Sequence, residues 1–529
     1  MKVDENGAPR VWRGETIRPT GFSGWRGVAA AALLAAVIAL PGLSAFALFD
    51  VDEAVFSEAT REMVASGDYG TPRYNGANRF DKPILFYWIQ AASFRVLGIS
   101  ELSARLPSAI AAILLALACH LFARRLWGER EALRAAAALV LCPFFLVYSH
   151  AAVTDMMLTL FIAASIFAFA AWGDEPDSPA GRWGLRLFYV FAALALLTKG
   201  LIGVLIPAGT AVWTMILSPD RRRIWKAISP SGILLFLAIA VPWHAAMLSL
   251  HGDAFTSAYF GKHHFARYTS VISGHTGPVW YYLPVLAIGF FPWIARVPEG
   301  AAQAWRSRRM SERTLVVWAA LVVLFFSFSS TKLPNYVLPA VPALALLAGR
   351  ARAGRLAAMS AGAVAALLAV GAVVAWRMEE VESLAIRPGL AVAAAAMAGL
   401  AVAAWSGARR DPFWRLAPAA AAFLLAVVFG ILPAVNRRAQ GTLRDYALQA
   451  RETLPAGGTL FAFRINAPSV SFYARRIVRV VPDAAALAGD APAPALAIAK
   501  TADAAEVERA GFRRLKDDGT YALLERAAR

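Results

Sequence analysis

The segment from residue 27 to residue 63 reads GVAAAALLAAVIALPGLSAFALFDVDEAVFSEATREM, and it decides the fold class. It begins with an apolar run of about 20 residues, the length that crosses a bilayer as a helix. Three acids, Asp50, Asp52 and Glu53, then fall within four residues. The pattern after them, with apolar residues at i, i+4 and i+8, is typical of another helix. The sequence therefore places carboxylates at the mouth of a membrane span.

The composition extends this pattern to the whole chain. Of 529 residues, 59% are hydrophobic and 17% are charged, whereas soluble domains carry about 25% charged residues. Apolar runs recur, and they predict about thirteen transmembrane helices. We expect these spans at 27–48, 104–126, 132–148, 154–172, 184–199, 200–217, 231–248, 280–297, 314–330, 336–349, 356–376, 388–406 and 415–434. The predicted fold class is an all-α polytopic membrane protein. The first span is expected to be retained.

Basic residues between the spans predict the topology. The net charge is +18, and it is concentrated in the clusters ARRLWGEREALR, PDRRRIWK, WRSRRMSER, RARAGR and GARRDPFWR. These clusters lie on alternate loops, on the same side as the basic N-terminal tail. Because cytoplasmic loops are enriched in Lys and Arg, we expect the N-terminus in the cytoplasm and, after an odd number of spans, the C-terminus outside. Topology accounts for the charge, so no nucleic-acid partner is expected.

The expected domain organisation has two parts. Residues 1–435 form the transmembrane domain, with long outer loops at 49–103 and 249–279. Residues 436–529 contain strand-like runs such as TLFAFRI, RIVRVV and YALLER, together with helical ones such as LRDYALQARETL. They predict a small periplasmic α/β domain. No internal repeat is evident, which counts against the inverted-repeat design of many transporters.

Charged residues collect at the outer ends of the predicted spans. Lys and Arg are disfavoured on that side, so each one there invites a functional explanation, and none lies at mid-membrane depth. Carboxylates with Lys and Arg at this boundary suit a substrate with a phosphate, such as a lipid phosphate, because both cations make charge-assisted hydrogen bonds to it. The basic residues are Arg61, Arg73, Arg79, Lys82, Arg95, Lys199, Lys262, Arg267 and Lys332, and the acids are Asp50, Asp52, Glu53, Asp81 and Asp155.

Each signal also has a purely structural interpretation. Asp52 is well placed to be a helix N-cap, and Asp50 with Glu53 resembles a capping box; spacing alone favours capping over catalysis. Asp155 has the same alternative. Lys199, before Gly200, has the pattern of a helix C-terminus.

Three further signals remain open in the same way. Lys332 could instead be a charge at the C-terminus of a helix that Pro334 ends. His263 and His264 are adjacent in a loop, where solvated histidines are commoner than metal ligands. The aromatic residues Trp280, Tyr281, Tyr282 and Trp293 are typical of an interfacial belt.

Five motifs together resemble one family. DVDEAVFSEATREMVASGDYGTPRYNGANRFDKPILFYW is similar to the first periplasmic loop of the bacterial lipid A aminoarabinose transferases. VTDMML, LTKG, HHFARY and SSTKLPNYVLPAVPALALLAG follow in the order of that family. These enzymes stand with the protein mannosyltransferases in the GT-C superfamily of polyprenyl-phosphate-dependent glycosyltransferases. The resemblance covers most of the chain.

The resemblance implies roles for particular residues. Asp52 is implied as the catalytic carboxylate, with Glu53 supporting its loop. Lys82 and Arg267 would hold the donor phosphate. The remaining implied residues are Lys199 and Asp155 where donor and acceptor meet, Tyr336 and Lys332 beside the bound lipid, Arg61 and Arg79 in the substrate cavity, and Asp81 with His264 as a divalent-metal site, of zinc if any.

The chain also departs from the family pattern. Asp81 stands in place of a Glu, Ile84 in place of a Pro, and Phe86 where Gly is common. Val55 and Phe56 occupy positions where the aminoarabinose enzymes tend to have Arg and Tyr, and Arg79 occupies a position that is often aromatic. Fold and reaction type survive these changes, whereas the sugar and the acceptor stay open.

The resemblance implies an inverting glycosyltransferase with a polyprenyl (undecaprenyl) phosphate sugar as donor and a lipid or glycan acceptor such as lipid A. No Gly-rich phosphate loop is present, so no nucleotide cofactor is expected. The resemblance also implies a bacterial inner membrane, with the C-terminus in the periplasm. We expect a monomer surrounded by membrane lipids. The alternatives are a flippase or transporter of lipid-linked sugars and a polysaccharide ligase. A flippase predicts mid-membrane polar residues and pseudo-symmetry, and the sequence has neither.

Overall fold

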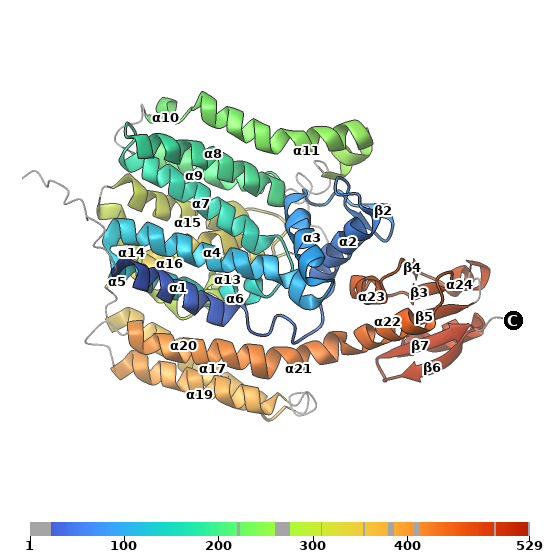
Figure 1. The fold of residues 1–529 in the computed structure, drawn as a ribbon. Coiled ribbons are helices and arrows are strands. Elements are labelled where there is room, and N and C mark those ends of the chain that lie inside the picture. The colour runs from blue at the N-terminus through green and yellow to red at the C-terminus, as the bar shows by residue number, and fades with distance from the viewer. Residues whose placement is uncertain are drawn as a thin grey trace, which may run out of the picture.

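A computed structural model describes residues 23–218, 223–259, 276–307, 309–352, 355–378, 386–406, 413–490 and 494–526. Long helices lie roughly along one direction, and two smaller parts sit at one end of them (Figure 1). One part contains the helices α2 and α3, and the other is a sheet domain near the C-terminus. This architecture confirms the predicted fold class.

Seven helices in the described part of the chain are long and apolar enough to cross a membrane. Three shorter apolar helices accompany them: α1 (Ser23–Ala39), α9 (Ile202–Ile216) and α17 (Arg355–Ala375). The seven long helices are α4 (Glu101–Trp127), α7 (Asp155–Asp174), α8 (Pro179–Lys199), α11 (Pro230–Thr256), α15 (Met310–Ser327), α19 (Arg387–Ser406) and the helix that starts with α20 (Phe413–Ala426). The short α10 (Arg223–Lys226) precedes α11.

Two predicted spans are bent. At 132–148, α5 (Glu129–Val140) and α6 (Pro143–Ser149) meet at 63°. At 280–297, the helical pieces on either side of Pro292 meet at 108°. Proline lacks the N–H that would continue the helix ladder, so the helix is broken at each of these places. The pieces around Pro292 are η2 (Val279–Tyr281), α13 (Tyr282–Gly289), η3 (Trp293–Arg296) and α14 (Val297–Arg306).

Every predicted span nonetheless falls on a helix or a bent helical pair. The segment predicted at 336–349 is η4 (Pro334–Ala340) followed by α16 (Val341–Arg350). The first span is shorter than predicted, because Pro41 and Gly42 (φ +85°) follow α1. The predicted break between α8 and α9 is confirmed at Gly200 (φ +85°), whose N–H donates to the Leu196 carbonyl oxygen at 2.8 Å.

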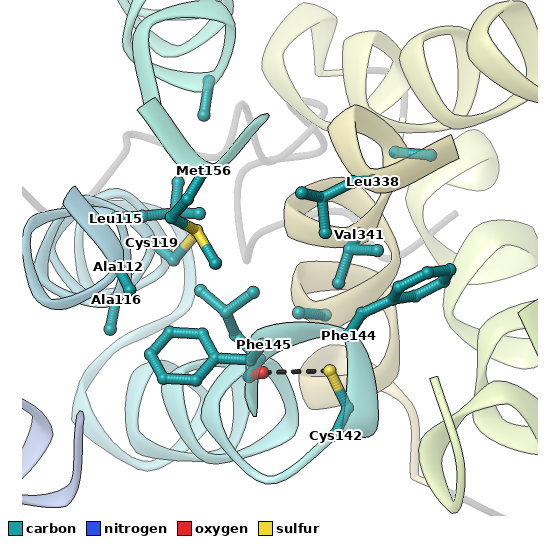
Figure 2. Packing of buried hydrophobic residues seen from close by; sticks show 14 of the residues in the cluster. Ala112, Leu115, Ala116, Cys119, Cys142, Phe144, Phe145, Met156, Leu338 and Val341 are labelled. Atoms are coloured by element: carbon teal, nitrogen blue, oxygen red, sulfur yellow. Dashed lines mark hydrogen bonds between the residues drawn. The ribbon is translucent and has the colours of Figure 1, made fainter. Parts of the chain in front are cut away.

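Small residues allow the central helices to pack closely. In Figure 2, Ala112, Ala116 and Cys119 of α4 lie opposite Met156 of α7 and the aromatic side chains of α6. Short side chains at helix contacts let backbones approach, which favours association inside a membrane. Both cysteines are buried, and the Cys142 thiol donates to the Leu139 carbonyl oxygen at 3.1 Å. They serve packing.

The first outer loop is folded. It contains α2 (Asp52–Ser66), the two-residue strands β1 (Arg73–Tyr74) and β2 (Ala77–Asn78), and α3 (Leu85–Leu97). The helix expected after the three acids is therefore confirmed as α2, which packs against α3.

The C-terminal domain is a five-stranded sheet with the order β4-β3-β5-β7-β6. The strands β4, β3 and β5 are parallel, and β7 and β6 pair antiparallel at one side. The strand bounds are β3 (Thr459–Phe463), β4 (Val478–Val481), β5 (Ala495–Lys500), β6 (Arg513–Asp517) and β7 (Tyr521–Arg526). The helices are α23 (Pro468–Ala474), α24 (Ala484–Asp490), η7 (Thr501–Asp503) and α25 (Ala504–Arg509).

One continuous helical stretch of 41 residues joins the membrane part to this domain, from Phe413 to Thr453. After α20 it consists of η5 (Val427–Ile431), α21 (Leu432–Asn436), η6 (Arg437–Gly441) and α22 (Thr442–Thr453). Figure 1 shows it running along the bundle and out to the sheet. Buried residues of α22 and α23 then pack on those of the first outer loop, so the domain is docked beside α2.

Candidate active site

A cavity of about 450 Å³ lies where α2 and its following loop meet the nearest ends of α7, α8, α9 and α15. Seven of the residues predicted from the sequence line it. Its polar lining is Asp52, Arg79, Asp81, Lys82, Thr154, Asp155, Lys199, Ser329, Asn335 and Tyr336. Its apolar lining is Phe56, Val153, Leu158, Leu201, Ile202, Leu205, Phe325, Phe326, Leu333 and Pro339. A charged group with an apolar tail matches such a two-sided lining.

Asp155 holds the centre of one wall. It is the first residue of α7, and its Oδ1 accepts from the Lys199 ammonium at 2.6 Å and from the Asn335 amide at 2.9 Å. Asp155 is buried, and the Lys199 side chain is 16% exposed. Asp155 therefore joins α7 to α8 and to η4, which contains Asn335. One face of the Lys199 ammonium remains at the cavity.

Arg79 and Asp81 form the opposite ion pair. The Arg79 guanidinium contacts the Asp81 carboxylate at 2.9 Å and donates to the Tyr87 hydroxyl at 3.3 Å. It also lies over the Phe56 ring, 5.5 Å from the ring centroid. Three positions at which the chain departs from the family pattern, Phe56, Arg79 and Asp81, thus form one contact group that lines the cavity.

Lys82 and Tyr336 complete the polar lining. The Lys82 ammonium donates to the backbone oxygen of Asp81 at 2.9 Å, which holds it at the cavity. The Tyr336 ring packs 4.8 Å from the ring of Phe326, where the polar and apolar linings meet.

Asp52 is the first residue of α2, and its side chain is exposed at the cavity. Among the described residues it makes no hydrogen bond or ion pair. The helix N-terminus favours a negative charge there. The carboxylate is therefore ionisable, accessible and uncommitted.

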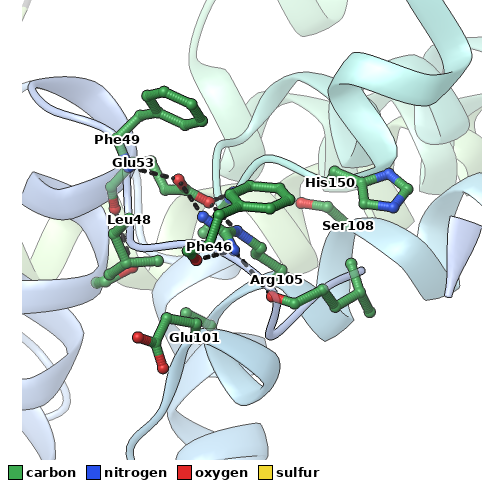
Figure 3. Close-up of polar contacts among 12 residues, drawn as sticks. Phe46, Leu48, Phe49, Glu53, Glu101, Arg105, Ser108 and His150 are labelled. Atoms are coloured by element: carbon green, nitrogen blue, oxygen red, sulfur yellow. Dashed lines mark hydrogen bonds and ion pairs between the residues drawn. The ribbon is translucent and has the colours of Figure 1, made fainter. Parts of the chain in front are cut away.

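Glu53 points the other way and holds the loop (Figure 3). Its carboxylate accepts two hydrogen bonds from the buried Arg105 guanidinium, at 2.6 and 2.9 Å. It also accepts from the backbone N–H groups of Phe49 and Ala152, at 2.8 and 2.9 Å. Arg105 in turn donates to the carbonyl oxygens of Leu43, Phe46 and Ala47. Glu53 therefore ties α2 to α4 and to the segment before α7.

The capping interpretation of the three acids is wrong. The residue before α2 is Val51, and no side chain caps this helix. Asp50 instead accepts from the backbone N–H and the hydroxyl of Ser469, at 2.8 and 2.6 Å. Burial raises the pKa of Asp50 to about 6, against the lowering effect of these two hydrogen bonds. Asp155 is likewise not an N-cap, because Thr154 holds that position.

Arg61 and Lys332 lie outside the cavity lining. Arg61 forms a two-pronged ion pair with Glu58 inside α2, at 2.7 and 2.8 Å. Burial raises the pKa of Glu58 to about 7, although Arg61 opposes that rise. The Lys332 ammonium donates to the carbonyl oxygens of Ser327 and Ser329, both at 2.8 Å. Lys332 therefore pairs with carbonyl oxygens at the end of α15, in agreement with its structural interpretation as a residue at a helix end.

Two predicted residues, Arg267 and His264, lie outside the described residues, as do Lys262 and His263. The metal expectation then rests on Asp81 alone within the described part, and Arg79 already pairs with that carboxylate. No group of three His, Cys, Asp or Glu side chains suited to a metal occurs among the described residues.

Asn335 and Arg105 were missed from the sequence. Asn335 stands between Pro334 and Tyr336 in the KLPNY segment, and this neighbourhood was its only signal. Arg105 is fully buried inside α4. An arginine in an apolar span is costly without partners, and that cost was the signal for a buried carboxylate partner.

Comparison with known sequences matches residues 81–245 to the family model described as dolichyl-phosphate-mannose-protein mannosyltransferase. A protein from Edwardsiella ictaluri named undecaprenyl phosphate-alpha-4-amino-4-deoxy-L-arabinose arabinosyl transferase is 32% identical over 333 residues. The aligned part is 62% of this chain and 59% of that relative, so it spans less than two thirds of the relative's length.

Solved structures extend the similarity to nearly the whole chain. The structure of ArnT from Cupriavidus metallidurans bound to undecaprenyl phosphate superposes with a TM-score of 0.85 at 28% sequence identity. The match covers 96% of this chain and 99% of that one. The archaeal oligosaccharyltransferase AglB from Archaeoglobus fulgidus shares the fold alone, with a TM-score of 0.51, 12% identity, and coverage of 95% of this chain and 74% of that one.

Proposed function

We propose that this chain, which has the GT-C fold and resembles the bacterial aminoarabinose transferases, is an inverting glycosyltransferase of the inner membrane. It takes a sugar from a polyprenyl phosphate such as undecaprenyl phosphate. It transfers that sugar to an envelope acceptor such as lipid A. The observation that carries the proposal is the exposed, uncommitted Asp52 carboxylate in a cavity lined by the cations Arg79, Lys82 and Lys199.

The reaction needs one base and one stabilised leaving group. An acceptor hydroxyl attacks the anomeric carbon, the bond from that carbon to the phosphate oxygen breaks, and the configuration inverts. The hydroxyl proton passes to Asp52 as general base. The departing polyprenyl phosphate gains negative charge beside Lys82 and Lys199, and fixed cations aimed at developing charge are usually the largest catalytic contribution. Arg267 would add a further cation.

The donor lipid fits the two-sided lining. The phosphate would lie against Lys82 and the polyprenyl chain against the apolar lining, which Leu201, Ile202 and Leu205 of the α8–α9 region help to form. Leu205 of α9 is 51% exposed, so part of this apolar lining reaches the outer surface of the bundle. The lipid would therefore reach the site sideways, without crossing water.

The periplasmic location of the site is supported by the distribution of basic residues. The Arg-rich ends of α4 and α14 lie at the end of the bundle opposite α2 (Figure 1). The positive-inside rule then puts α2, the cavity and the C-terminal domain in the periplasm and the N-terminus in the cytoplasm.

The sugar and acceptor depend on the contact group of Phe56, Arg79 and Asp81. A 4-amino-4-deoxyarabinose is one candidate, because the name of the relative from Edwardsiella ictaluri includes that sugar. Arg79 lies over the Phe56 ring and pairs with the Asp81 carboxylate, so this wall presents a neutral ion pair that can both donate hydrogen bonds to a sugar and accept them from it.

A divalent metal does not fit the described residues. Asp81 would be its one carboxylate ligand there, and the Arg79 guanidinium already neutralises it at 2.9 Å. The proposed reaction therefore has no step that uses a metal.

The first test is an Asp52→Asn variant assayed in vitro with a polyprenyl-phosphate sugar. Loss of the base should lower transfer by about 10²- to 10⁴-fold, while thermal unfolding stays close to that of the wild type, because Asp52 makes no hydrogen bond or ion pair among the described residues. Asp445→Asn is the matched control, since it too removes one exposed carboxylate from the first turn of a helix, here α22 outside the cavity. Transfer at the wild-type rate by Asp52→Asn would remove Asp52 from the mechanism.

A further inference from the structure

The segment from Ala47 to Asp50 leads directly into Asp52, and three of its four residues are held by distant parts of the chain. Phe49 is held by Glu53, as described above. The other three residues are held by side chains far along the sequence, on α21 and α23 (Figure 1). We name Asn436, Ser469 and Tyr473 the docking clamp.

Each member of the docking clamp makes a directed hydrogen bond. The Asn436 amide accepts from the Ala47 N–H at 2.8 Å and donates to the Ala47 carbonyl oxygen at 2.9 Å. The Tyr473 hydroxyl accepts from the Leu48 N–H at 2.8 Å. It also donates to Glu101 at the start of α4, at 3.1 Å.

Ser469 completes the docking clamp at Asp50, two residues before Asp52. Its backbone N–H and its hydroxyl reach both carboxylate oxygens, at 2.8 and 2.6 Å. The clamp thus holds the backbone at Ala47 and Leu48 and the side chain at Asp50, on the path into α2. Ala47, Leu48 and Ala54 are buried in one apolar cluster with Phe472 and Tyr473 of α23, so the contact excludes water.

None of the docking-clamp residues lines the cavity. They therefore cannot touch substrate there, and any effect on the reaction must pass through the backbone to Asp52. Misplacing a catalytic group by about 1 Å can cost about 10²-fold in rate. Asp50 lies only two residues before Asp52, so the backbone between them is short enough to transmit such a shift.

We propose that the C-terminal domain is a positioning element for catalysis, whose docking clamp sets the place of the Asp52 carboxylate relative to the bound donor. This inference rests on the proposed function, because it assigns Asp52 as the base. Asn436, Ser469 and Tyr473 are positioning residues. Losing one of them lowers kcat and leaves the KM for the donor unchanged, since the phosphate and lipid contacts stay in place.

The chain offers a matched control at a second contact between the same two parts. The Asn75 side chain donates to the Val478 carbonyl oxygen and accepts from the Val478 N–H, both at 3.0 Å. These bonds dock the same domain, but they lie after α2, away from the segment that leads into Asp52. Asn75 has φ +53°, so Asn75→Gly removes the bonds without strain in the backbone.

The experiment compares Ser469→Ala, Tyr473→Phe and Asn75→Gly in the full-length protein. Measurements are kcat and KM with a polyprenyl-phosphate sugar, the melting temperature, and hydrogen exchange of residues 47–56 without substrate. The first two variants should lose about tenfold or more in kcat at constant KM and exchange faster at 47–56. Asn75→Gly should lower the melting temperature by a similar amount and keep kcat within about twofold.

A decline of kcat in proportion to melting temperature across all three variants would overturn the proposal, as would unchanged kcat in Ser469→Ala and Tyr473→Phe. Asp50→Asn, which keeps an acceptor for the Ser469 N–H, should retain more activity than Asp50→Ala. Absence of transfer in the wild type would instead overturn the proposed function. In that case the hydrogen exchange still decides whether the clamp orders residues 47–56, and unchanged exchange would overturn the inference.

Discussion

Asp155 and Lys199 illustrate how one buried pair serves both structure and chemistry. Their 2.6 Å contact holds the ends of α7 and α8 together and keeps an ammonium at the cavity wall. A buried charge that loses its partner is strongly destabilising, whereas removing both members costs far less. Stability and activity should therefore separate in mutants of this pair.

Lys199→Met should destabilise the protein by about 3 kcal/mol, because the buried Asp155 carboxylate keeps Asn335 as its one described partner. Asp155→Asn combined with Lys199→Met should regain much of that stability, since no charge is left buried. Transfer should stay low in the double variant, because the cation for the leaving phosphate is missing. Chemical unfolding in detergent and the transfer assay measure the two effects. Equal stability of the single and double variants would contradict the pairing.

Arg79 and Asp81 make a prediction about metal removal. Because the Asp81 carboxylate is already paired with Arg79, chelation by EDTA should leave transfer unchanged. Assaying the enzyme before and after dialysis against EDTA checks this directly. Activity that is lost on dialysis and regained with Zn²⁺, but not with Mg²⁺, would show that Asp81 binds a metal together with ligands beyond the described residues.

At the scale of elements, α2 is the decisive piece. Two consecutive residues at its start have different roles: Asp52 faces the cavity, and Glu53 anchors the helix to Arg105. Helical periodicity predicted α2, but spacing could not tell which acid points where. That choice depends on Arg105 and Ser469, which are 52 residues and 419 residues away from their partners.

The junction between α2 and the C-terminal domain should respond to pH. Burial raises the pKa of Asp50 to about 6 in the folded protein, above the ordinary value of about 3.9. The folded state therefore binds more protons than the unfolded state between about pH 4 and pH 6, so stability falls as pH rises through that window.

Thermal unfolding from pH 4 to pH 7.5 measures this dependence. The wild type should lose stability across the window, and Asp50→Asn should lose less, because its amide does not titrate. Glu58, whose pKa burial raises to about 7, should keep part of the slope in that variant. Parallel curves for the wild type and Asp50→Asn would contradict the burial of Asp50 at this junction.

Across the whole molecule, sequence reasoning located the helices better than their shapes. Long apolar runs have one stable solution in a bilayer, so every predicted span falls on helical structure. The bend at Pro292 and the early end of α1 depend on how the neighbouring helices pack against the chain where its helix is broken. In the C-terminal domain, the predicted runs omitted both β5 and β6. The five residues of β6, Arg513–Asp517, are exposed and mostly charged. They carry no apolar alternation to predict a strand.

The sequence indicated charged residues that line the cavity, but it did not indicate which side chains pair with one another. Excess Lys and Arg on the predicted outer side pointed to Lys82 and Lys199, and both line it. Arg61 and Lys332 gave the same signal, yet they are satisfied by Glu58 and by backbone carbonyls. Asn335 reaches Asp155 across 180 residues of sequence, a contact that depends on how α7 and η4 pack.

The most direct test of the whole account is mass spectrometry of envelope lipids and glycans from a deletion strain. The strain should lack one sugar modification, whose mass names the donor and whose carrier names the acceptor. The wild-type gene should restore it, and the gene encoding Asp52→Asn should not. An unchanged envelope in the deletion strain, or restoration by Asp52→Asn, would contradict glycosyl transfer at this cavity.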